Sequence, residues 1–299
     1  MLKKNNLLLI ALAITSIVLV FLFKQPTVPG SFGGELLHHV TNDSSHVYIP
    51  IKIAGIDLSI TKHVILIWAV SGLVIILALI GTARYRNNKN ALPSKFSGLF
   101  ELLIDFIRKD LVIPNIGKSD ANRWTPLITT FFIFILFSNF LGLIPFLEFL
   151  PGGSGTITGN FAVTGALALI TFVAIIIAGT MKHGFIGHWK NMIPGGVPAP
   201  VLLILIPVEI MGMFIKPLAL LLRLGANMTA GHIGMVAIFG LPYLVHLSMG
   251  DSVGFGVGFV SVILTTALYF LEMIVCMVQA YVFALLSSVF IGMAIHAEH

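Results

Sequence analysis

The stretch Ile215-Lys-Pro-Leu-Ala-Leu-Leu-Leu-Arg-Leu-Gly-Ala-Asn-Met-Thr-Ala-Gly-His232 places a basic residue, Arg223, in the middle of an apolar segment that runs from Val201 to Leu247. A charged side chain at the centre of a bilayer costs about 2.5–3.5 kcal/mol on insertion scales. A membrane helix that contains such a residue therefore has a partner or a task for it. The segment predicts a membrane protein whose central charged group is Arg223.

The composition of the whole chain supports this class. Of its 299 residues, 57% are hydrophobic and only 10% are charged, whereas a soluble domain has about 25% charged residues. These values predict an all-α polytopic membrane protein. The net charge of +5 is typical of basic cytoplasmic loops, so we expect no nucleic-acid partner. The single cysteine, Cys276, excludes an intrachain disulfide and a cysteine metal cluster, and we expect it to be a small buried side chain. We predict no metal site and no cofactor.

The first residues have the order of a secretion signal. A basic start precedes an apolar run from Leu7 to Phe23, and no small-residue cleavage site follows it. Residues 1–23 are therefore either a cleaved signal peptide or an uncleaved signal anchor. Both alternatives put residues 24–62 on the exported side, as a polar N-terminal extension with a short amphipathic piece. The spacing of its three histidines fits no metal-binding pattern: His38, His39 and His46.

Residues 63–299 form the predicted membrane domain. Five apolar segments are long enough to cross about 30 Å of hydrocarbon; they are His63–Thr82, Pro126–Leu147, Asn160–Thr180, Val201–Leu247 and Gly254–Ile295. Basic residues follow the first and the third segment, so both of these loops are expected on the cytoplasmic side. Ser94–Val112 has apolar residues at helical spacing, which indicates an amphipathic helix in the membrane interface.

The last two segments are longer than an upright membrane helix needs. Val201–Leu247 would extend about 70 Å as a single helix. It is either two spans joined by a tight turn near Gly225 or Gly231, or one long and steeply tilted helix. Its three prolines are positions at which the helix is expected to kink. Gly254–Ile295 has the same excess length, and two such segments in succession argue against an ordinary upright bundle.

Few ionisable residues lie within these two segments. They are Glu209, Lys216, Arg223, His232, His246 and Glu272, with Gln279 as a polar companion. Positions seven apart nearly coincide around an α-helix, so Glu209, Lys216 and Arg223 share one stripe. Asn227 lies one turn beyond Arg223 on the same side. His232 follows Arg223 by nine residues and therefore points roughly to the opposite side.

This layout suggests a path for protons. Glu209 is nearest the cytoplasmic loop, Arg223 lies deeper, and His232 lies toward the exported side. Glu272, about 25 Å along its helix from the exported end, shares a face with Gln279 and comes within reach of His232. An imidazole and a carboxylate can exchange protons, because histidine titrates near neutral pH. Arginine keeps its proton, so the hypothesis is two proton routes separated by a fixed positive charge.

Structural roles are the alternatives for the same residues. A lone histidine or glutamine in a membrane helix often makes a packing hydrogen bond. Lys216 precedes a proline and alternatively extends its amine to the membrane interface. Arg223 alternatively forms a structural ion pair with Glu272. The small residues between Gly225 and Gly234 permit close helix approach under either interpretation.

The segment from Lys216 to His232 resembles the signature of the a subunit of F-type ATP synthases of the bacterial type. Glu209 upstream, and Glu272 and Gln279 downstream, fall at matching spacing. The resemblance covers most of the chain after the N-terminal extension. Many members have Leu-Phe-Gly-Asn after the arginine, whereas this chain has Leu-Gly-Ala-Asn, which changes packing but not the pattern of charges. Some members have the His232 and Glu272 residue types exchanged, which keeps a titratable pair.

The resemblance implies a function and partners. In that family, the a subunit lies in the inner membrane beside a rotating ring of c subunits, each with a carboxylate, and the b subunits of the peripheral stalk are further partners. The subunit is not catalytic, and its two long helices tilt along the ring. Arg223 matches the arginine that faces the ring carboxylate, and Glu209 matches a residue of the cytoplasmic half-channel. The outer half-channel and ring-facing positions are matched by His232, Glu272, Asn227 and Gln279.

Two other classes of function compete with this one. A secondary transporter with an intramembrane Arg–Glu site is the main rival, but transporters often contain internal repeats, and the two long segments do not match each other. A membrane-embedded enzyme is the third class. The sequence has no His-Glu-x-x-His, no Gly-x-Ser-x-Gly and no Gly-rich phosphate loop, so the proton-translocating subunit is the preferred interpretation.

Overall fold

A computed structural model describes residues 47–53, 56–57, 59–87, 92, 95–144, 156–190 and 199–296. In this part of the chain, five helices are long and apolar enough to cross a membrane. They are α3 (Lys62–Asn87), α6 (Lys118–Gly142), α8 (Phe161–His183), α10 (Ala199–Met249) and α11 (Asp251–Ile295). The predicted all-α polytopic class is confirmed. The signal-like segment 1–23 and the three histidines of the extension lie outside the described residues.

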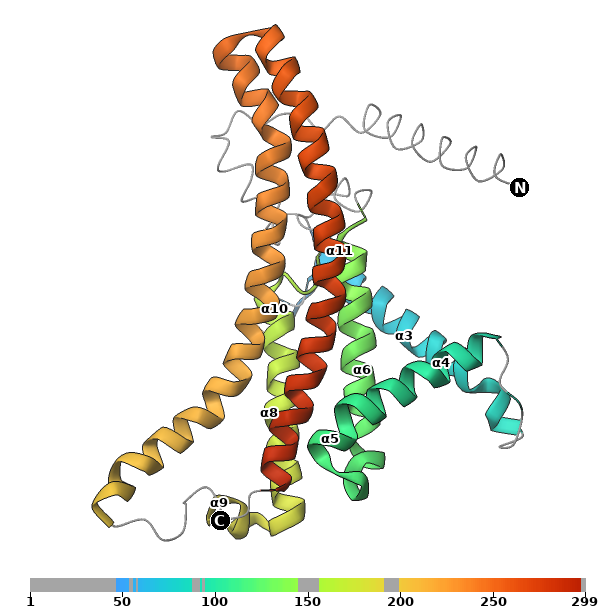
Figure 1. Ribbon diagram of the computed structural model, residues 1–299, viewed down its shortest axis with the longest axis vertical. Coiled ribbons are helices and arrows are strands. Elements are labelled where there is room, and N and C mark those ends of the chain that lie inside the picture. Colours follow the sequence, from blue (N-terminus) through green and yellow to red (C-terminus); the bar gives the residue numbers. More distant parts are fainter. Residues whose placement is uncertain are drawn as a thin grey trace.

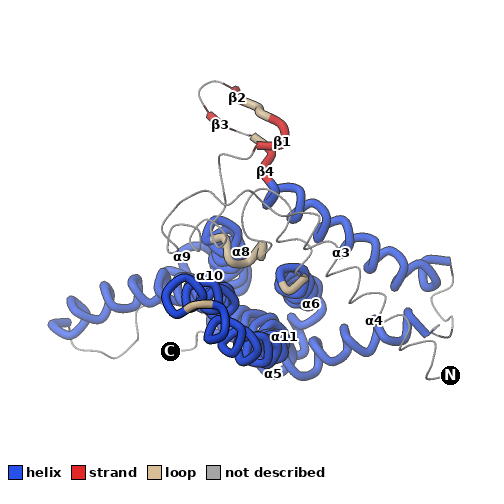
Figure 2. Tube along the Cα trace, turned by 90° about the horizontal axis from the view of Figure 1, so that it is seen from above, coloured by secondary structure: helices blue, strands red, loops and turns tan. Residues whose placement is uncertain are grey.

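The core lies between α6, α8 and the C-terminal half of α11. These helices run side by side with the middle of α10 (Figures 1 and 2). The largest side chains that are fully buried come from these helices and from the short helices between α3 and α6; they include Ile107, Leu111, Ile116, Ile128, Ile135, Leu224 and Ile291. Helix α3 stands to one side of this bundle (Figure 2), where a smaller cluster of Leu66, Val70 and Ile157 holds its first turns.

The predicted amphipathic helix is present, and its environment changes along its length. Helix α4 (Lys95–Phe106) continues into the π-helical turn η1 (Ile107–Val112) and the short helix α5 (Ile113–Ile116). On α4 the apolar side chains of Leu99 and Leu102 are 67% and 69% exposed, whereas Ile107 and Leu111 are fully buried. A π turn adds a residue to the helical repeat, so the apolar side turns from the surface to the core at η1.

Helix α10 is continuous over 51 residues. The alternative of two spans with a tight turn near Gly225 or Gly231 is therefore wrong, because both glycines lie inside the helix. The alternative of a single long helix is confirmed. The N-terminal part of α10, which contains two of its three prolines, bends away from the bundle (Figure 1), as expected for helix interiors that lack a backbone donor.

A short turn joins α10 to α11, which is 45 residues long. Gly250 has φ +85°, a conformation that favours glycine. The Nδ1 atom of His246 lies 3.0 Å from the Asp251 carboxylate across this turn. The resulting helical hairpin extends past the ends of α6 and α8 (Figure 1).

The start of α6 differs from the sequence-based expectation. Helix α6 begins at Lys118, after Gly117 with φ +89°, and Pro126 lies inside the helix rather than at its start. The hydroxyl of Thr130, one turn further along the helix, donates to the Pro126 carbonyl (2.8 Å). Within the predicted N-terminal extension, four short strands form two antiparallel pairs: β1 (Val47–Ile49) with β4 (Ile60–Thr61), and β2 (Lys52–Ile53) with β3 (Ile56–Asp57).

Candidate functional site

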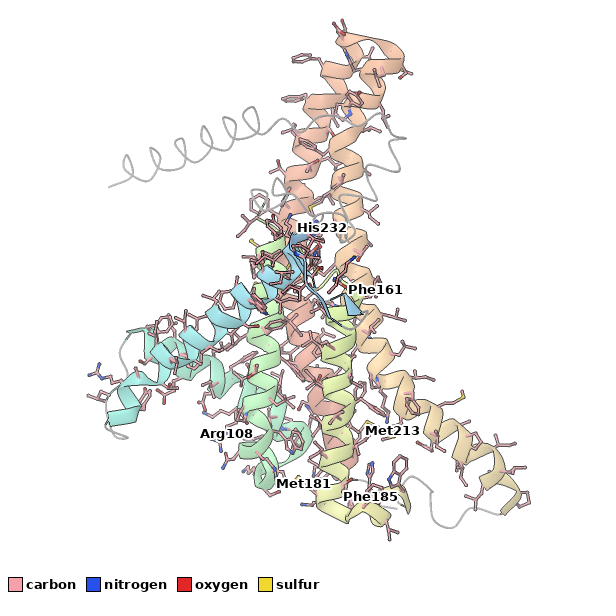
Figure 3. The ribbon with its side chains drawn as sticks, turned by 180° about the vertical axis from the view of Figure 1, so that it is seen from behind. Arg108, Phe161, Met181, Phe185, Met213 and His232 are labelled. Atoms are coloured by element: carbon pink, nitrogen blue, oxygen red, sulfur yellow. The ribbon has the colours of Figure 1, made fainter. Side chains whose placement is uncertain are left out.

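The predicted pair His232 and Glu272 meets between α10 and α11. Their side chains are 3% and 7% exposed, and the imidazole interacts electrostatically with the carboxyl group. Gly231 makes this approach possible, because a Cβ atom at this position would collide with both carboxylate oxygens of Glu272. Figure 3 shows His232 above Phe161, the first residue of α8. The pair is therefore buried between α10 and α11 just beyond the start of α8.

Gln279 connects this region to Arg223 through the backbone. Its Nε2 atom donates to the main-chain oxygen of Arg223 (2.7 Å), and its side chain is 7% exposed. Gln279 and Glu272 are both buried, which agrees with the prediction that they share one face of α11. The bond fixes the register of α11 against α10 at the position of the arginine.

The side chain of Arg223 lies on the other side of α10. Arg223 and Asn227 are exposed, whereas Leu224 and Met228, each one position further along, are buried. Among the residues that the structure describes, no ion pair joins Arg223 to Glu272. The alternative of a structural Arg223–Glu272 pair is therefore wrong, because Arg223 lies on the exposed side of α10, whereas Glu272 of α11 packs against the other side of α10 at Gly231.

Glu209 and Lys216 lie nearer the N-terminus of α10, away from the His232–Glu272 pair. Glu209 is exposed in the part of α10 that bends from the bundle. Lys216 is half-buried, and its Nζ atom lies 6.0 Å from the centroid of the Phe290 ring on α11, the distance of a weak cation–π contact. The amine therefore packs at the α10–α11 interface instead of extending along the helix surface.

A polar network beside the pair was only partly foreseen. Asn139 of α6 hydrogen-bonds to a neighbouring helix, because its Nδ2 atom donates to the Cys276 carbonyl of α11 (3.3 Å). The Asn139 Oδ1 atom accepts from the hydroxyl of Thr158, a residue that the sequence did not single out. Cys276 itself is fully buried, as predicted.

The segment that carries Thr158 is tied to α10 as well. The hydroxyl of Thr229 donates to the Gly159 carbonyl (3.2 Å). Asn160 then begins α8, because its side chain accepts from the backbone N–H of Ala162 (2.9 Å). An asparagine before an apolar helical run is a recognisable N-cap, so this signal could have marked the segment as ordered. The segment therefore connects α6, α8 and α10 by hydrogen bonds.

This arrangement has the chemical parts of a proton-exchange site. It combines a carboxyl, an imidazole, two side-chain amides and a hydroxyl inside an otherwise apolar bundle. In the described part of the chain, the Oε1 atom of Glu272 is buried without a hydrogen-bond partner, and such an atom is costly unless it serves a purpose. An imidazole and a carboxyl can exchange a proton, and the amides and the hydroxyl can hold such groups in place by hydrogen bonds.

Comparisons with known proteins agree with the geometry. The family described as ATP synthase A chain matches residues 64–292. ATP synthase subunit a of Chloroherpeton thalassium is 36% identical over 275 residues, which cover 89% of this chain and 78% of the relative. The subunit a proteins of Anaeromyxobacter dehalogenans and Myxococcus xanthus are 40% and 42% identical, over 88% and 82% of this chain and 70% and 75% of the relatives. This chain therefore belongs to the ATP synthase A chain family.

Proposed function

We propose that this chain provides two proton half-channels to the carboxylates of a rotating c-ring, with Arg223 as the charge that separates them. Membership of the family already makes the chain a membrane-embedded subunit of the proton-transporting sector of ATP synthase. The half-channels, the role of the arginine, and the c-ring and b subunits as neighbours are the proposed part.

The observation that carries the proposal is an exposed arginine on an apolar helix face. Next to Arg223, the side chain of Leu222 is 49% exposed. Ala226 and Ala230 continue the same exposed side of α10. A cation on a lipid-depth surface needs a counter-charge, and none pairs with Arg223 among the described residues. A carboxylate on a neighbouring subunit meets that need, and small residues allow its helix to approach closely.

The buried groups behind this face form the proposed outer half-channel. His232, Glu272 and Gln279 lie inside the α10–α11 contact, and Asn227 is exposed one turn from the arginine. A proton passed from the Glu272–His232 pair reaches the ring next to Asn227. Glu209 and Lys216 belong to the route on the other side of Arg223, toward the N-terminal end of α10.

The chemistry follows from charge alone. A cation within about 4–6 Å of a carboxyl favours its ionised form, so a ring carboxylate that reaches Arg223 releases its proton into one route. After the ring moves, the carboxylate leaves the arginine and accepts a proton from the other route. The guanidinium does not release its own proton, and protons therefore cannot pass between the routes without rotation. Each charge that crosses 100 mV supplies about 2.3 kcal/mol.

The test is ATP-driven proton pumping in inverted membrane vesicles. We expect Arg223→Ala to abolish pumping while the c-ring still co-purifies with the chain. Arg123→Ala is the matched control, because Arg123 is an exposed arginine at the start of α6, away from α10. Normal pumping by an intact Arg223→Ala complex would contradict the proposal. If that variant fails to assemble, Glu272→Gln and His232→Ala test the outer half-channel in its place, and normal pumping by both variants would also contradict it.

A further inference from the structure

A cleft of about 490 Å³ separates the C-terminal end of α3 from α4. The two helices touch at one edge of it, where a Cβ atom added to Gly81 would lie 2.6 Å from the Phe100 ring. Beyond this contact, polar and charged side chains from both helices and from η1 line the cleft: Thr82, Tyr85, Ser97, Glu101, Asp105 and Arg108. This site is separate from the α10–α11 contact that the proposed function uses.

The charged groups in the cleft differ in whether they have a partner among the described residues. Glu101 accepts a hydrogen bond from the Tyr85 hydroxyl (2.9 Å), and Asp105 is paired with Lys109 (2.6 Å). Arg108 has no ion pair within the described residues, and its Nε atom is buried without a hydrogen-bond partner there. A buried N–H donor without a partner is costly, and the half-buried guanidinium lines the cleft, so the cleft offers an anion site at Arg108 with carboxylates close by.

The surroundings of the cleft are apolar and exposed. On α3, the side chains of Ile76, Leu79 and Ile80 are 53%, 58% and 54% exposed. On α4, Leu99 and Leu102 are exposed as well. The basic residues that follow α3 predict that this end of the helix lies at the cytoplasmic surface. The cleft therefore lies at headgroup depth, beside surfaces suited to acyl chains.

We propose that this cleft binds the headgroup of one zwitterionic, amine-bearing phospholipid. The phosphate is held by the guanidinium of Arg108, and the ammonium group is held by Glu101 and Asp105. A headgroup with only negative charge would place that charge beside two carboxylates. A headgroup with only positive charge would leave Arg108 without a partner. A zwitterion satisfies both kinds of group, and its acyl chains cover the exposed side of α3.

The first test measures lipid that is retained by the intact ATP synthase complex containing this chain. The complex is placed in nanodiscs with equal amounts of phosphatidylethanolamine and phosphatidylglycerol, extracted in mild detergent, and analysed by quantitative lipid mass spectrometry. We expect one phosphatidylethanolamine to remain with the wild type. Arg108→Gln should lower this retention at least fivefold, whereas Arg84→Gln, which removes an exposed arginine from the same end of α3, should not. Equal retention by wild type and Arg108→Gln would overturn the proposal.

A second variant separates the ammonium contact from the phosphate contact. Glu101→Gln removes one negative charge from the cleft and leaves Arg108 in place. We expect its preference to shift from phosphatidylethanolamine toward phosphatidylglycerol at least threefold, and an unchanged preference would contradict the ammonium contact.

The third test identifies what occupies the cleft. Thr82→Cys, labelled with a benzophenone, is suitable because Thr82 is an exposed residue of the cleft lining, whereas the native Cys276 is buried. A lipid adduct in the assembled complex supports the proposal. A protein adduct, which would show a helix of another subunit in the cleft, overturns it.

Discussion

The two halves of α11 lie in opposite environments. From Glu272 to Ile295, one face of α11 packs into the bundle, and the side chains on that face are buried, among them Cys276, Phe283, Ser287 and Ile291. From Asp251 to Leu271, it forms the projecting end of the hairpin with α10 (Figure 1). There, Phe255, Phe259 and Phe270 are 85%, 72% and 65% exposed. The two halves have similarly apolar sequences, so hydropathy does not distinguish them.

This difference shows that burial, rather than hydropathy, identifies the specific contacts of a membrane protein. Lipid is as apolar as leucine, so an exposed apolar helix face costs little in a bilayer. In such a chain, buried residues identify the places where helices pack closely or where polar groups are enclosed. The His232–Glu272 pair lies at the border of the two halves, where the bundle ends and the hairpin continues. The packed half fixes the position of Glu272, and the projecting half continues beyond it.

The largest effect on stability is expected in the packed half. A Cβ atom added to Gly292 would collide with the Asn115 carbonyl oxygen and lie 2.8 Å from its carbon. Backbone cannot move aside as a flexible side chain can, so Gly292→Ala should destabilise the chain by about 1–3 kcal/mol. The measurement is the Tm of the purified protein.

Gly256→Ala is the matched control in the projecting half, because nothing lies within 4 Å of its added Cβ atom. This control should not lower the Tm, since alanine favours a helix over glycine by about 1 kcal/mol. Equal Tm values for Gly292→Ala and Gly256→Ala would contradict the difference in packing between the two halves of α11.

A second prediction addresses the border between the halves. Gly231→Ala puts a methyl group where the Glu272 carboxylate lies, and it should displace the carboxyl group from His232. We expect ATP-driven pumping to fall about tenfold, which corresponds to about 1.4 kcal/mol, with the complex intact. Gly234→Ala adds the same methyl group one turn away in open space and should pump normally. Similar pumping by both variants would contradict the importance of the close approach.

The smallest expected effect lies at the end of the bundle opposite the hairpin. Burial, followed by the neighbouring His183, lowers the pKa of His188 on α9 (Phe185–Lys190). This imidazole packs so closely on Gly179 that a Cβ atom there would collide with its ring. A lowered pKa in the folded state means that the contribution of His188 is complete above its unfolded value, about 6.5, and is lost as the pH falls below it.

The measurement is amide hydrogen exchange of α9 at pH 7.5 and pH 5.5. Exchange corrected for its intrinsic pH dependence should be faster at pH 5.5 in the wild type. His188→Gln, which cannot be protonated, should lack this difference, while His183 remains as the other titratable group at the contact. A pH difference that persists in His188→Gln would assign the effect to His183 instead and contradict the prediction.

Much of the fold could be predicted because the membrane restricts the choices. Apolar length identified all five spans, since only helices satisfy their own backbone within a bilayer. The position of α6 was less accurate, because a helix start was assigned to Pro126 while the positive φ of Gly117 sets the actual one. The sequence did not decide whether α10 was one helix or two. Glycines at possible turn positions, and prolines, are both tolerated within membrane helices.

The candidate site was predictable where it depended on helical spacing. His232 follows Arg223 by nine positions, which predicted opposite faces; Arg223 is exposed and His232 is buried. The contributions of Gly231, Thr158 and Gly159 were missed or understated. Each depends on contacts between helices, and spacing along one helix does not report which neighbour a residue meets. The charge separation at Arg223 stays a prediction.

The passive proton leak tests that separation most directly. It is measured in vesicles that contain the membrane sector without its ATP-hydrolysing part, with an imposed potential and with c-ring content confirmed by co-purification. If Arg223 is the barrier between two half-channels, Arg223→Ala should raise the leak well above that of the wild type while coupled pumping is lost. A leak as low as that of the wild type, in an assembled Arg223→Ala sector, would contradict the claim that this charge keeps the two routes apart.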